Sequence, residues 1–417
     1  MLIEDCNLYD GERLIKDCSI EIDEGRIKGV YKGKGKGKGK GKGKGKDEKA
    51  ARKLVIPGMV CCHSHAYSAL APGFPAKPAS TFLEILGNFW WRYDLLLSLE
   101  DVRWWGAIAG LSYLRHGVTT LIDHHSSPNA ILGSLERLGE GFELAGIRAC
   151  PCYEISDRNG EGKTTEAIRE NEQYIHDHKG GMLGLHASFT LSDETLERCT
   201  SIVDSLHVPV HVHVDEGLID HKKYDSPPVK RLEPLLRKGS IAAHCVHSTP
   251  NDLRILRSHG VFPVLNPRSN AHNRVGTVNL PNMLASGLIP GLGNDGLGYD
   301  LFEEARALYF HQPVASSKVL EILFRNGSKI ASSIFNDKIG LVKEGYRADL
   351  VVLSGDLPVI GEEELIYNLE STAIERVIVE GKVVFSGGKF TKDPGQIQAE
   401  AQKSKERIFS RALNDLP

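Results

Sequence analysis

The segment Leu54-Val-Ile-Pro-Gly-Met-Val-Cys-Cys-His-Ser-His65 contains the pattern that decides the fold. A short apolar run passes through Pro57-Gly58 and ends in two histidines one residue apart. Residues two apart in an extended strand lie on the same face, so His63 and His65 point the same way. An apolar strand that ends in two metal-type side chains predicts a buried parallel strand with a polar site at its carboxyl end.

Similar apolar runs follow downstream and alternate with stretches of helical periodicity. The helical stretches include 100–116, 131–145, 195–206 and 253–259. The expected strands are 54–60, 118–123, 147–153, 182–189, 208–214, 240–246, 261–266 and 288–293. Eight such units over roughly 280 residues fit an α/β fold of the (β/α)₈ TIM-barrel type better than an open doubly wound sheet.

The two chain ends contain short β segments of another kind, such as 20–30, 348–353 and 377–384. We expect them to form a small β-sandwich, with residues 1–56 as its first part and residues 340–417 as its second part and C-terminal tail. The barrel then covers 57–339. A strict Lys-Gly alternation at 32–46 predicts a solvated, flexible loop, and an anion-binding tether is the alternative.

The net charge of the chain indicates which kinds of partner it can bind. The formal net charge is −3, and without the eight lysines of the Lys-Gly tract it is 43 − 54, near −11. This argues against a nucleic-acid or membrane surface and favours a small-molecule partner. The acidic start Met1-Leu-Ile-Glu-Asp5 does not match a signal peptide, so we expect a cytoplasmic protein. A homo-oligomer remains compatible with the sequence.

Chemistry-bearing residues gather where the predicted strands end, which is where barrel enzymes hold their catalytic groups. Imidazoles at several strand ends and a carboxylate at another predict a metal site. The residues at these ends are His63 and His65, Asp123-His124-His125, His186, His211 to Glu216, His244 and His247, and Asp295.

These residues carry a resemblance. The chain resembles the amidohydrolase superfamily, whose pattern is Pro-Gly-x-x-x-x-His-x-His on strand one, a histidine each on strands five and six, and an aspartate on strand eight. The matching positions are Pro57-Gly58, His63, His65, His213, His244 and Asp295. The segments 213–216, 242–247, 266–270 and 294–296 resemble cytosolic aminohydrolases, and 90–94 with 123–128 are most similar to SsnA-type aminohydrolases.

The resemblance implies one metal ion per chain. Superfamily members with two metals use a lysine on strand four, and 182–189 contains none. The implied ligands are His63, His65, His213 and Asp295. Three imidazoles and a carboxylate suit Zn²⁺ or Fe²⁺, with Zn²⁺ expected first.

The resemblance also implies roles in catalysis. A metal-activated hydroxide attacks the substrate, and Asp295 is the expected base. Glu216, three residues after His213, is the expected acid that protonates a ring nitrogen. His244 orients the hydroxide and stabilises its charge. Substrate contacts are expected from His186, Trp90, Arg92 and Asp94, and His124 with His125 are candidates for supporting the ligands.

The leading hypothesis is therefore hydrolytic deamination of an amino-substituted, purine-like heterocycle. Dechlorination or hydrolysis of a cyclic amide of the imidazolone type are neighbouring hypotheses. A non-catalytic barrel scaffold is the alternative from another class.

Overall fold

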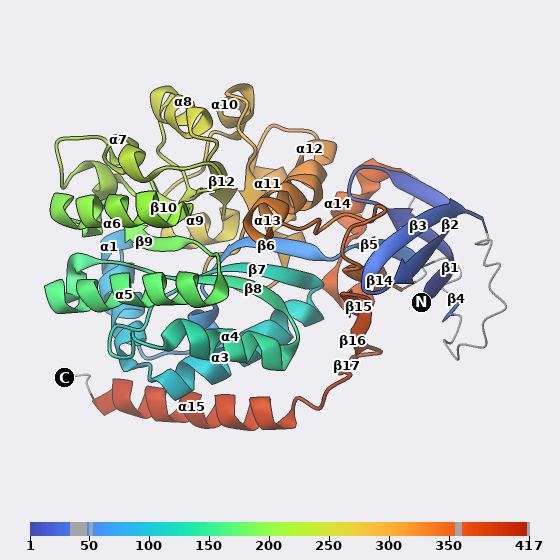
Figure 1. Ribbon diagram of the computed structural model, residues 1–417, viewed down its shortest axis with the longest axis horizontal. Coiled ribbons are helices and arrows are strands. Elements are labelled where there is room, and N and C mark those ends of the chain that lie inside the picture. Colours follow the sequence, from blue (N-terminus) through green and yellow to red (C-terminus); the bar gives the residue numbers. More distant parts are fainter. Residues whose placement is uncertain (34–47, 50–52, 355–360, 415–417) are drawn as a thin grey trace.

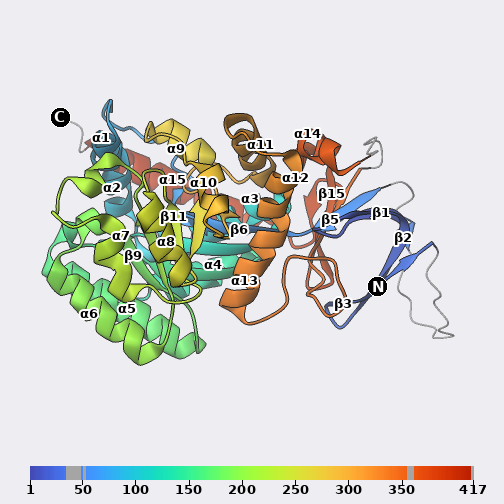
Figure 2. The same ribbon diagram turned by 90° about the horizontal axis from the view of Figure 1, so that it is seen from above.

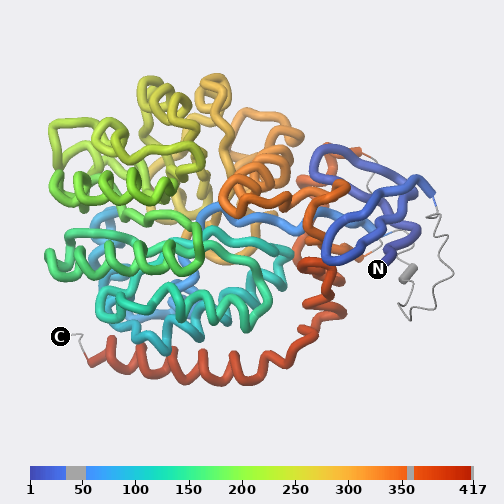
Figure 3. Tube along the Cα trace, in the orientation of Figure 1, coloured from blue at the N-terminus to red at the C-terminus, as the bar shows by residue number. Residues whose placement is uncertain are grey.

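The computed structural model describes residues 1–33, 48–49, 53–354 and 361–414. A barrel of strands and helices occupies one side, and a sheet built from both chain ends lies beside it (Figure 1). The tube trace shows the first and the last strands of the chain meeting in this sheet (Figure 3). Residues 34–46 of the Lys-Gly tract lie outside the described residues, so the loop expected for the tract stays a prediction.

Eight parallel strands form the barrel, and within each of its two sheets every strand pairs with the next in chain order. They fall into a three-stranded and a five-stranded sheet, which isolated parallel bridges join at both seams: Ile155 with Leu185, and Ser64 with Asp295. The eight strands thus follow one another around a ring, and the predicted (β/α)₈ architecture is confirmed. The strands are β6 (Met59–Ser64), β7 (Val118–His125), β8 (Arg148–Tyr153), β9 (Leu183–Ala187), β10 (Val210–Val214), β11 (Ile241–His244), β12 (Phe262–Leu265) and β13 (Gly291–Leu292).

Helices cover the outside of this ring (Figure 2). Local signals set several helix starts: Ser98 and Asp101 form a capping box at α3, and Thr249 and Asp252 form another at α8. The longer helices are α3 (Leu99–Arg115), α4 (Ser134–Ala145), α5 (Glu161–His178), α6 (Asp193–Leu206), α8 (Pro250–Ser258), α11 (Leu301–His311) and α13 (Gly327–Phe335). Shorter ones are α7 (Pro228–Leu232), α9 (Pro267–Asn273), α10 (Leu280–Ala285) and α12 (Ser316–Leu320).

The single strand expected at 54–60 is wrong in one respect, because the structure divides it into two. Strand β5 (Leu54–Pro57) pairs with strands of the end sheet, whereas β6 begins at Met59 and enters the barrel. Pro57 lacks an amide hydrogen, and the Gly58 N–H donates to Asp349 O at 2.8 Å. A Cβ at Gly58 would lie 2.4 Å from Thr119 Oγ1, so a side chain there would collide with the barrel.

The two chain ends combine in one nine-stranded sheet of mixed direction. The order is β17-β16-β15-β14-β5-β1-β2-β3, and β4 pairs with β1. Five strands come from the beginning of the chain and four from its end: β1 (Leu2–Tyr9), β2 (Leu14–Asp23), β3 (Arg26–Lys32), β4 (Glu48–Lys49), β5, β14 (Leu350–Leu353), β15 (Ile374–Val379), β16 (Lys382–Ser386) and β17 (Lys389–Phe390). The domain boundaries at 56/57 and 339/340 stay a prediction.

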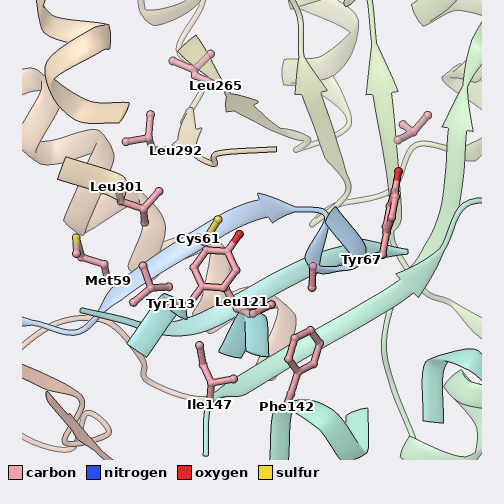
Figure 4. Packing of buried hydrophobic residues seen from close by; sticks show 14 of the residues in the cluster. Met59, Cys61, Tyr67, Tyr113, Leu121, Phe142, Ile147, Leu265, Leu292 and Leu301 are labelled. Atoms are coloured by element: carbon pink, nitrogen blue, oxygen red, sulfur yellow. The ribbon is translucent and has the colours of Figure 1, made fainter. Parts of the chain in front are cut away.

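Apolar side chains of the barrel strands and of the helices that cover them pack together in one buried cluster (Figure 4). Cys61, Leu121, Leu265 and Leu292 come from four different strands and are buried in one cluster. Tyr113 is also buried there and donates from Oη to Asn294 Oδ1 at 2.9 Å. This packing fixes the strands, so the polar residues at their carboxyl ends are held by a rigid base.

The C-terminal tail of the sequence forms α15 (Gly395–Asn414), which passes below the barrel and packs on α3 (Figure 1). Ser404 lies at the centre of the contact: it accepts from Trp105 Nε1 at 2.6 Å and donates to Asp101 Oδ1. Arg407 pairs with the same carboxylate. Among the described helices, none is long and apolar enough to cross a membrane.

We expect Ser404→Ala to destabilise the protein by about 1–3 kcal/mol, because it leaves the buried Trp105 N–H without an acceptor and removes one of the donors to Asp101. Urea unfolding measures the effect. Ser410→Ala on the exposed side of the same helix is the control and should change stability little. Equal stability of the two variants would contradict the role of Ser404.

Candidate active site

Three histidines and an aspartate meet at the carboxyl end of the barrel. Asp295 Oδ1 lies 2.9 Å from His65 Nε2 and 3.3 Å from His63 Nε2. His65 Nε2 in turn lies 3.1 Å from His213 Nε2. His63, His213, His244 and Asp295 also form a group whose ligand atoms lie within 4.8 Å of one another. The structure therefore brings together all the metal ligands that the sequence suggested.

This donor set fits a divalent transition metal. The buried Nε2 atoms of His63 and His244 have no hydrogen-bond partner, which would cost free energy if nothing bound there. Several imidazoles and one carboxylate within contact of each other are the ligands of Zn²⁺ and Fe²⁺ sites.

Neighbouring groups hold the ligand side chains in orientation. His63 Nδ1 lies 2.8 Å from His211 Nε2, and His65 Nδ1 lies 2.7 Å from the carbonyl oxygen of His124. Ser269 Oγ donates to Asp295 Oδ2. Each contact holds the outer atom of a clustered side chain, while its other polar atom faces the common centre, which is the arrangement found around metal sites.

The backbone is strained where it enters the site. His244 and Asp295 have φ angles of 74° and 55°, in a left-handed region that non-glycine residues rarely adopt. Such strain persists only where surrounding packing enforces it, and it concentrates at functional sites. Gly293 allows the close approach, since a Cβ there would lie 2.6 Å from His63 O and from Asn266 Oδ1.

The pKa values of the clustered histidines are shifted in opposite directions. Burial lowers the pKa of His63 to about 3 and holds that of His213 well below its usual value. Burial also disfavours charge on His65, but the adjacent Asp295 carboxylate outweighs it and raises the pKa of His65 to about 9. The pKa of Asp295 is held well below its usual range, because its histidine neighbours outweigh the effect of burial.

Glu216 and His244 lie beside the cluster on adjacent strand ends. His244 Nε2 is 3.7 Å from Glu216 Oε2, and His244 Nδ1 is 2.8 Å from Asn270 Oδ1. Asn273 Nδ2 donates to Glu216 Oε1 at 3.1 Å. Burial raises the pKa of the Glu216 carboxyl above its usual value.

A pocket opens over the cluster. Three of the four residues expected to contact substrate line it: His186, Trp90 and Asp94. The rest of the lining comprises His65, Tyr67, Leu86, Trp91, Glu154, His213, Glu216, Asn273, Asp295 and Gly296.

Arg92, the fourth expected substrate residue, is not part of the pocket lining. Its guanidinium faces Pro75 O at 3.5 Å and the Phe74 ring at 6.0 Å. Residues 91–93 are helical, so consecutive side chains point in different directions, and Trp91 faces the pocket instead. The Trp91 ring lies 6.3 Å from that of His186.

Asp94 is also engaged elsewhere. Its Oδ2 accepts from Ser126 Oγ at 2.8 Å and pairs with Arg158, whose guanidinium lies 5.4 Å from the Trp91 ring. This chain of contacts anchors the segment that covers the pocket. The role of Arg158 could not be predicted from the sequence, because no motif or spacing around it indicates that it pairs with Asp94.

Glu154 is the second residue that sequence reasoning missed. It directly follows β8, and its Oε1 lies 3.1 Å from His124 Nδ1 and 3.6 Å from His65 Nδ1. The sequence did contain a signal for Glu154, because an acidic residue at the carboxyl end of the third barrel strand is expected to face the site. His125 contacts Ser127 Oγ at 2.9 Å and does not line the pocket.

A parallel barrel with a cluster of histidines and an aspartate at the carboxyl ends of its strands is typical of metal-dependent hydrolases. The chain belongs to the amidohydrolase family, whose model matches residues 54–384.

Relatives and solved structures agree with this membership. The chain is 29% identical to 5'-deoxyadenosine deaminase of Methanopyrus kandleri, over 96% of this chain and 97% of that protein. It is 27% identical to 5-methylthioadenosine/S-adenosylhomocysteine deaminase of Desulforudis audaxviator, over 94% of each. An adenosine deaminase from Xanthomonas campestris with bound zinc shares the fold, with a TM-score of 0.82, 20% identity and coverage of 98% of both chains.

We expect Arg158→Met to destabilise the protein by about 3–5 kcal/mol, because it leaves the buried Asp94 carboxylate without its charge partner. The double variant Asp94→Asn/Arg158→Met should recover part of this loss. Thermal unfolding of both single variants and the double variant measures the coupling. Additive losses would show that the pair does not hold the segment.

Proposed function

We propose that the protein is a mononuclear metal-dependent aminohydrolase that removes ammonia from an amino-substituted heterocycle. The observation that carries the proposal is the cluster of His63, His65, His213 and Asp295 with the protonatable Glu216 beside it. The deaminase names of the two relatives support the reaction type, and their adenosine-derived substrates favour a purine ring.

His63, His65, His213 and Asp295 would hold one divalent ion, with Zn²⁺ as the first expectation because a structural neighbour binds zinc. When bound, such an ion lowers the pKa of a water molecule so that a nucleophile is available at neutral pH. His244 is a further donor on the same centre, with its Nε2 free to contact the attacking water.

Side chains of the protein carry out the proton transfers. Asp295 takes a proton from the attacking water, which forms a bond to the ring carbon that carries the amino group. Glu216 donates a proton to the neighbouring ring nitrogen, so the ring loses its aromaticity and accepts the oxygen. The C–N bond then breaks: Asp295 passes its proton to the amine, which leaves as ammonia. The hydroxyl of the adduct loses its proton to Glu216, so the product retains a carbonyl and both carboxyl groups return to their starting states. Burial of Glu216 in the pocket raises its pKa, a shift in the direction that this role needs.

Two neighbouring reactions share the same centre: hydrolysis of a cyclic amide and dechlorination. Release of ammonia separates deamination from both. The decisive experiment is a screen of aminopurines, pterins and pyrimidines, as free bases and nucleosides, for ammonia release by the zinc-loaded protein. Ring opening or chloride release without ammonia would favour a neighbouring reaction, and inactivity of the metal-loaded protein on all classes would favour a scaffold.

We expect close to one tightly bound metal ion per chain. The ligand set serves one ion, and strand β9 supplies no lysine to bridge a second. Elemental analysis after saturation with Zn²⁺ and removal of excess metal measures the ratio. Asp295→Ala should lower it, whereas Asp337→Ala, far from the pocket lining, should not. Two ions per chain, both needed for turnover, would contradict the mononuclear site.

We expect Glu216→Gln to retain the metal and to lose turnover by on the order of 10²-fold or more, because the amide cannot donate the proton. Steady-state kinetics on the screened substrate and elemental analysis measure the two properties. Glu303→Gln is the matched control, since Glu303 pairs with Arg268 outside the pocket. Near-normal turnover of Glu216→Gln would remove it from the reaction.

A further inference from the structure

One wall of the pocket contains two polar residues that the proposed hydrolytic steps do not use. Glu154 follows β8 and His186 lies in β9, and both line the pocket that contains the metal-type cluster. Both side chains are at least nine-tenths buried, with exposures of 6% each. Buried polar groups of this kind need hydrogen-bond partners, so the atoms that each presents to the pocket define what can bind there.

Glu154 is an acceptor, because an ionised carboxylate carries no hydrogen. His124 Nε2 lies 3.2 Å from the carbonyl oxygen of His211 and donates to it. His124 Nδ1 lies 3.1 Å from Glu154 Oε1, an ion-pair distance without hydrogen-bond geometry. Glu154 Oε2 therefore has only lone pairs to offer. The close contacts of the Glu154 carboxylate with His124 and His65 both involve Oε1, which leaves Oε2 for a bound molecule.

A similar argument fixes the tautomer of His186. Thr190 Oγ1 donates its only hydrogen to Ala187 O at 3.0 Å. The contact between His186 Nδ1 and Thr190 Oγ1, at 2.8 Å, therefore requires Nδ1 to donate. In the neutral imidazole this leaves Nε2 as a lone-pair acceptor. Trp91 lies across from this ring and closes the wall with an apolar surface.

The wall thus offers acceptors and no hydrogen of its own at these two positions. A ligand that fills the pocket without donors would desolvate both acceptors and leave them unpaired, which penalises binding strongly. A ligand with N–H or O–H groups facing the wall would satisfy them.

We propose that Glu154 and His186 form an acceptor pair that selects substrates carrying hydrogen-bond donors on the part of the molecule facing this wall. The inference rests on the proposed function, and it narrows the substrate class within it. The donors can come from a ring amino or lactam N–H, or from the hydroxyls of an attached sugar, and the two sources share the same chemistry of recognition.

Two matched pairs of compounds separate these sources. 2,6-Diaminopurine differs from adenine by one amino donor on the ring. Adenosine differs from 2',3'-dideoxyadenosine by its sugar hydroxyl donors. For each pair we would measure kcat/KM by ammonia release and Kd by calorimetry, with the zinc-loaded wild-type protein and with Glu154→Met. The control is Glu170→Met, which changes another buried glutamate that accepts from Gly133 N and Leu135 N away from the pocket.

The wild-type protein should prefer the donor-bearing member of at least one pair. Glu154→Met should lower that preference by roughly 10-fold to 100-fold, because a hydrogen bond to a charged or charge-sharing group is lost. Glu170→Met should lower the melting temperature and leave the preference unchanged. If Glu154→Met does not fold, His186→Met tests the same wall and should reduce the preference in the same direction.

Three results would overturn the inference: an unchanged preference in Glu154→Met, no preference in the wild-type protein for either pair, or loss of a second zinc equivalent on substitution of Glu154. The last would make Glu154 a ligand within the group His65, His124, Glu154 and His213, whose ligand atoms also lie within 4.8 Å of one another. Preference in Kd without any ammonia release would instead contradict the proposed function and leave the acceptor pair intact.

Discussion

The contact between the first and the last barrel strands is the constraint on which the rest of the site depends. His63 O accepts from the N–H groups of Asn294 and Asp295 at 3.2 and 3.3 Å, and His65 N donates to Asp295 O at 3.1 Å. These bonds close the ring of strands. They also place Asp295 against the two histidines, although about 230 residues of chain separate them. Closing the barrel and assembling the cluster are therefore one structural event.

This coupling explains where the strain in the backbone lies. Asp295 and His244 both adopt left-handed φ angles at the point where their strands end. Each conformation is unfavourable for a residue with a Cβ, and the surrounding pairs compensate: Ser269 with Asp295, and Asn270 with His244. The apolar packing below, which includes Leu121 and Leu292, supplies the rigidity that holds these geometries.

The pocket above the cluster has two functionally different sides. On one side Glu216, with its raised pKa, can donate a proton, and Asn273 orients it. On the other side Glu154 and His186 present acceptors. A heterocycle bound between them would meet a proton donor at one edge and acceptors at another, so orientation and chemistry would be set together. Asp94 shapes the pocket indirectly. It pairs with Arg158, and the Arg158 guanidinium lies against the Trp91 ring and holds it over the pocket.

The sequence by itself determined the barrel and the identity of the clustered residues. Apolar runs of strand length, alternating with helical periodicity, left few folds available, and strand ends in a barrel converge by geometry. The pair His63 and His65 was readable because alternation along a strand puts both on one face. The tertiary structure alone decided which side chains turn into the pocket. Arg92 turns away while Trp91 faces inward, and this depends on the exact phase of a short helical segment and on the distant Arg158. The hydrogen-bond roles of Glu154 and His186 likewise follow from partners on other elements, His124 and Thr190, whose positions no local pattern encodes.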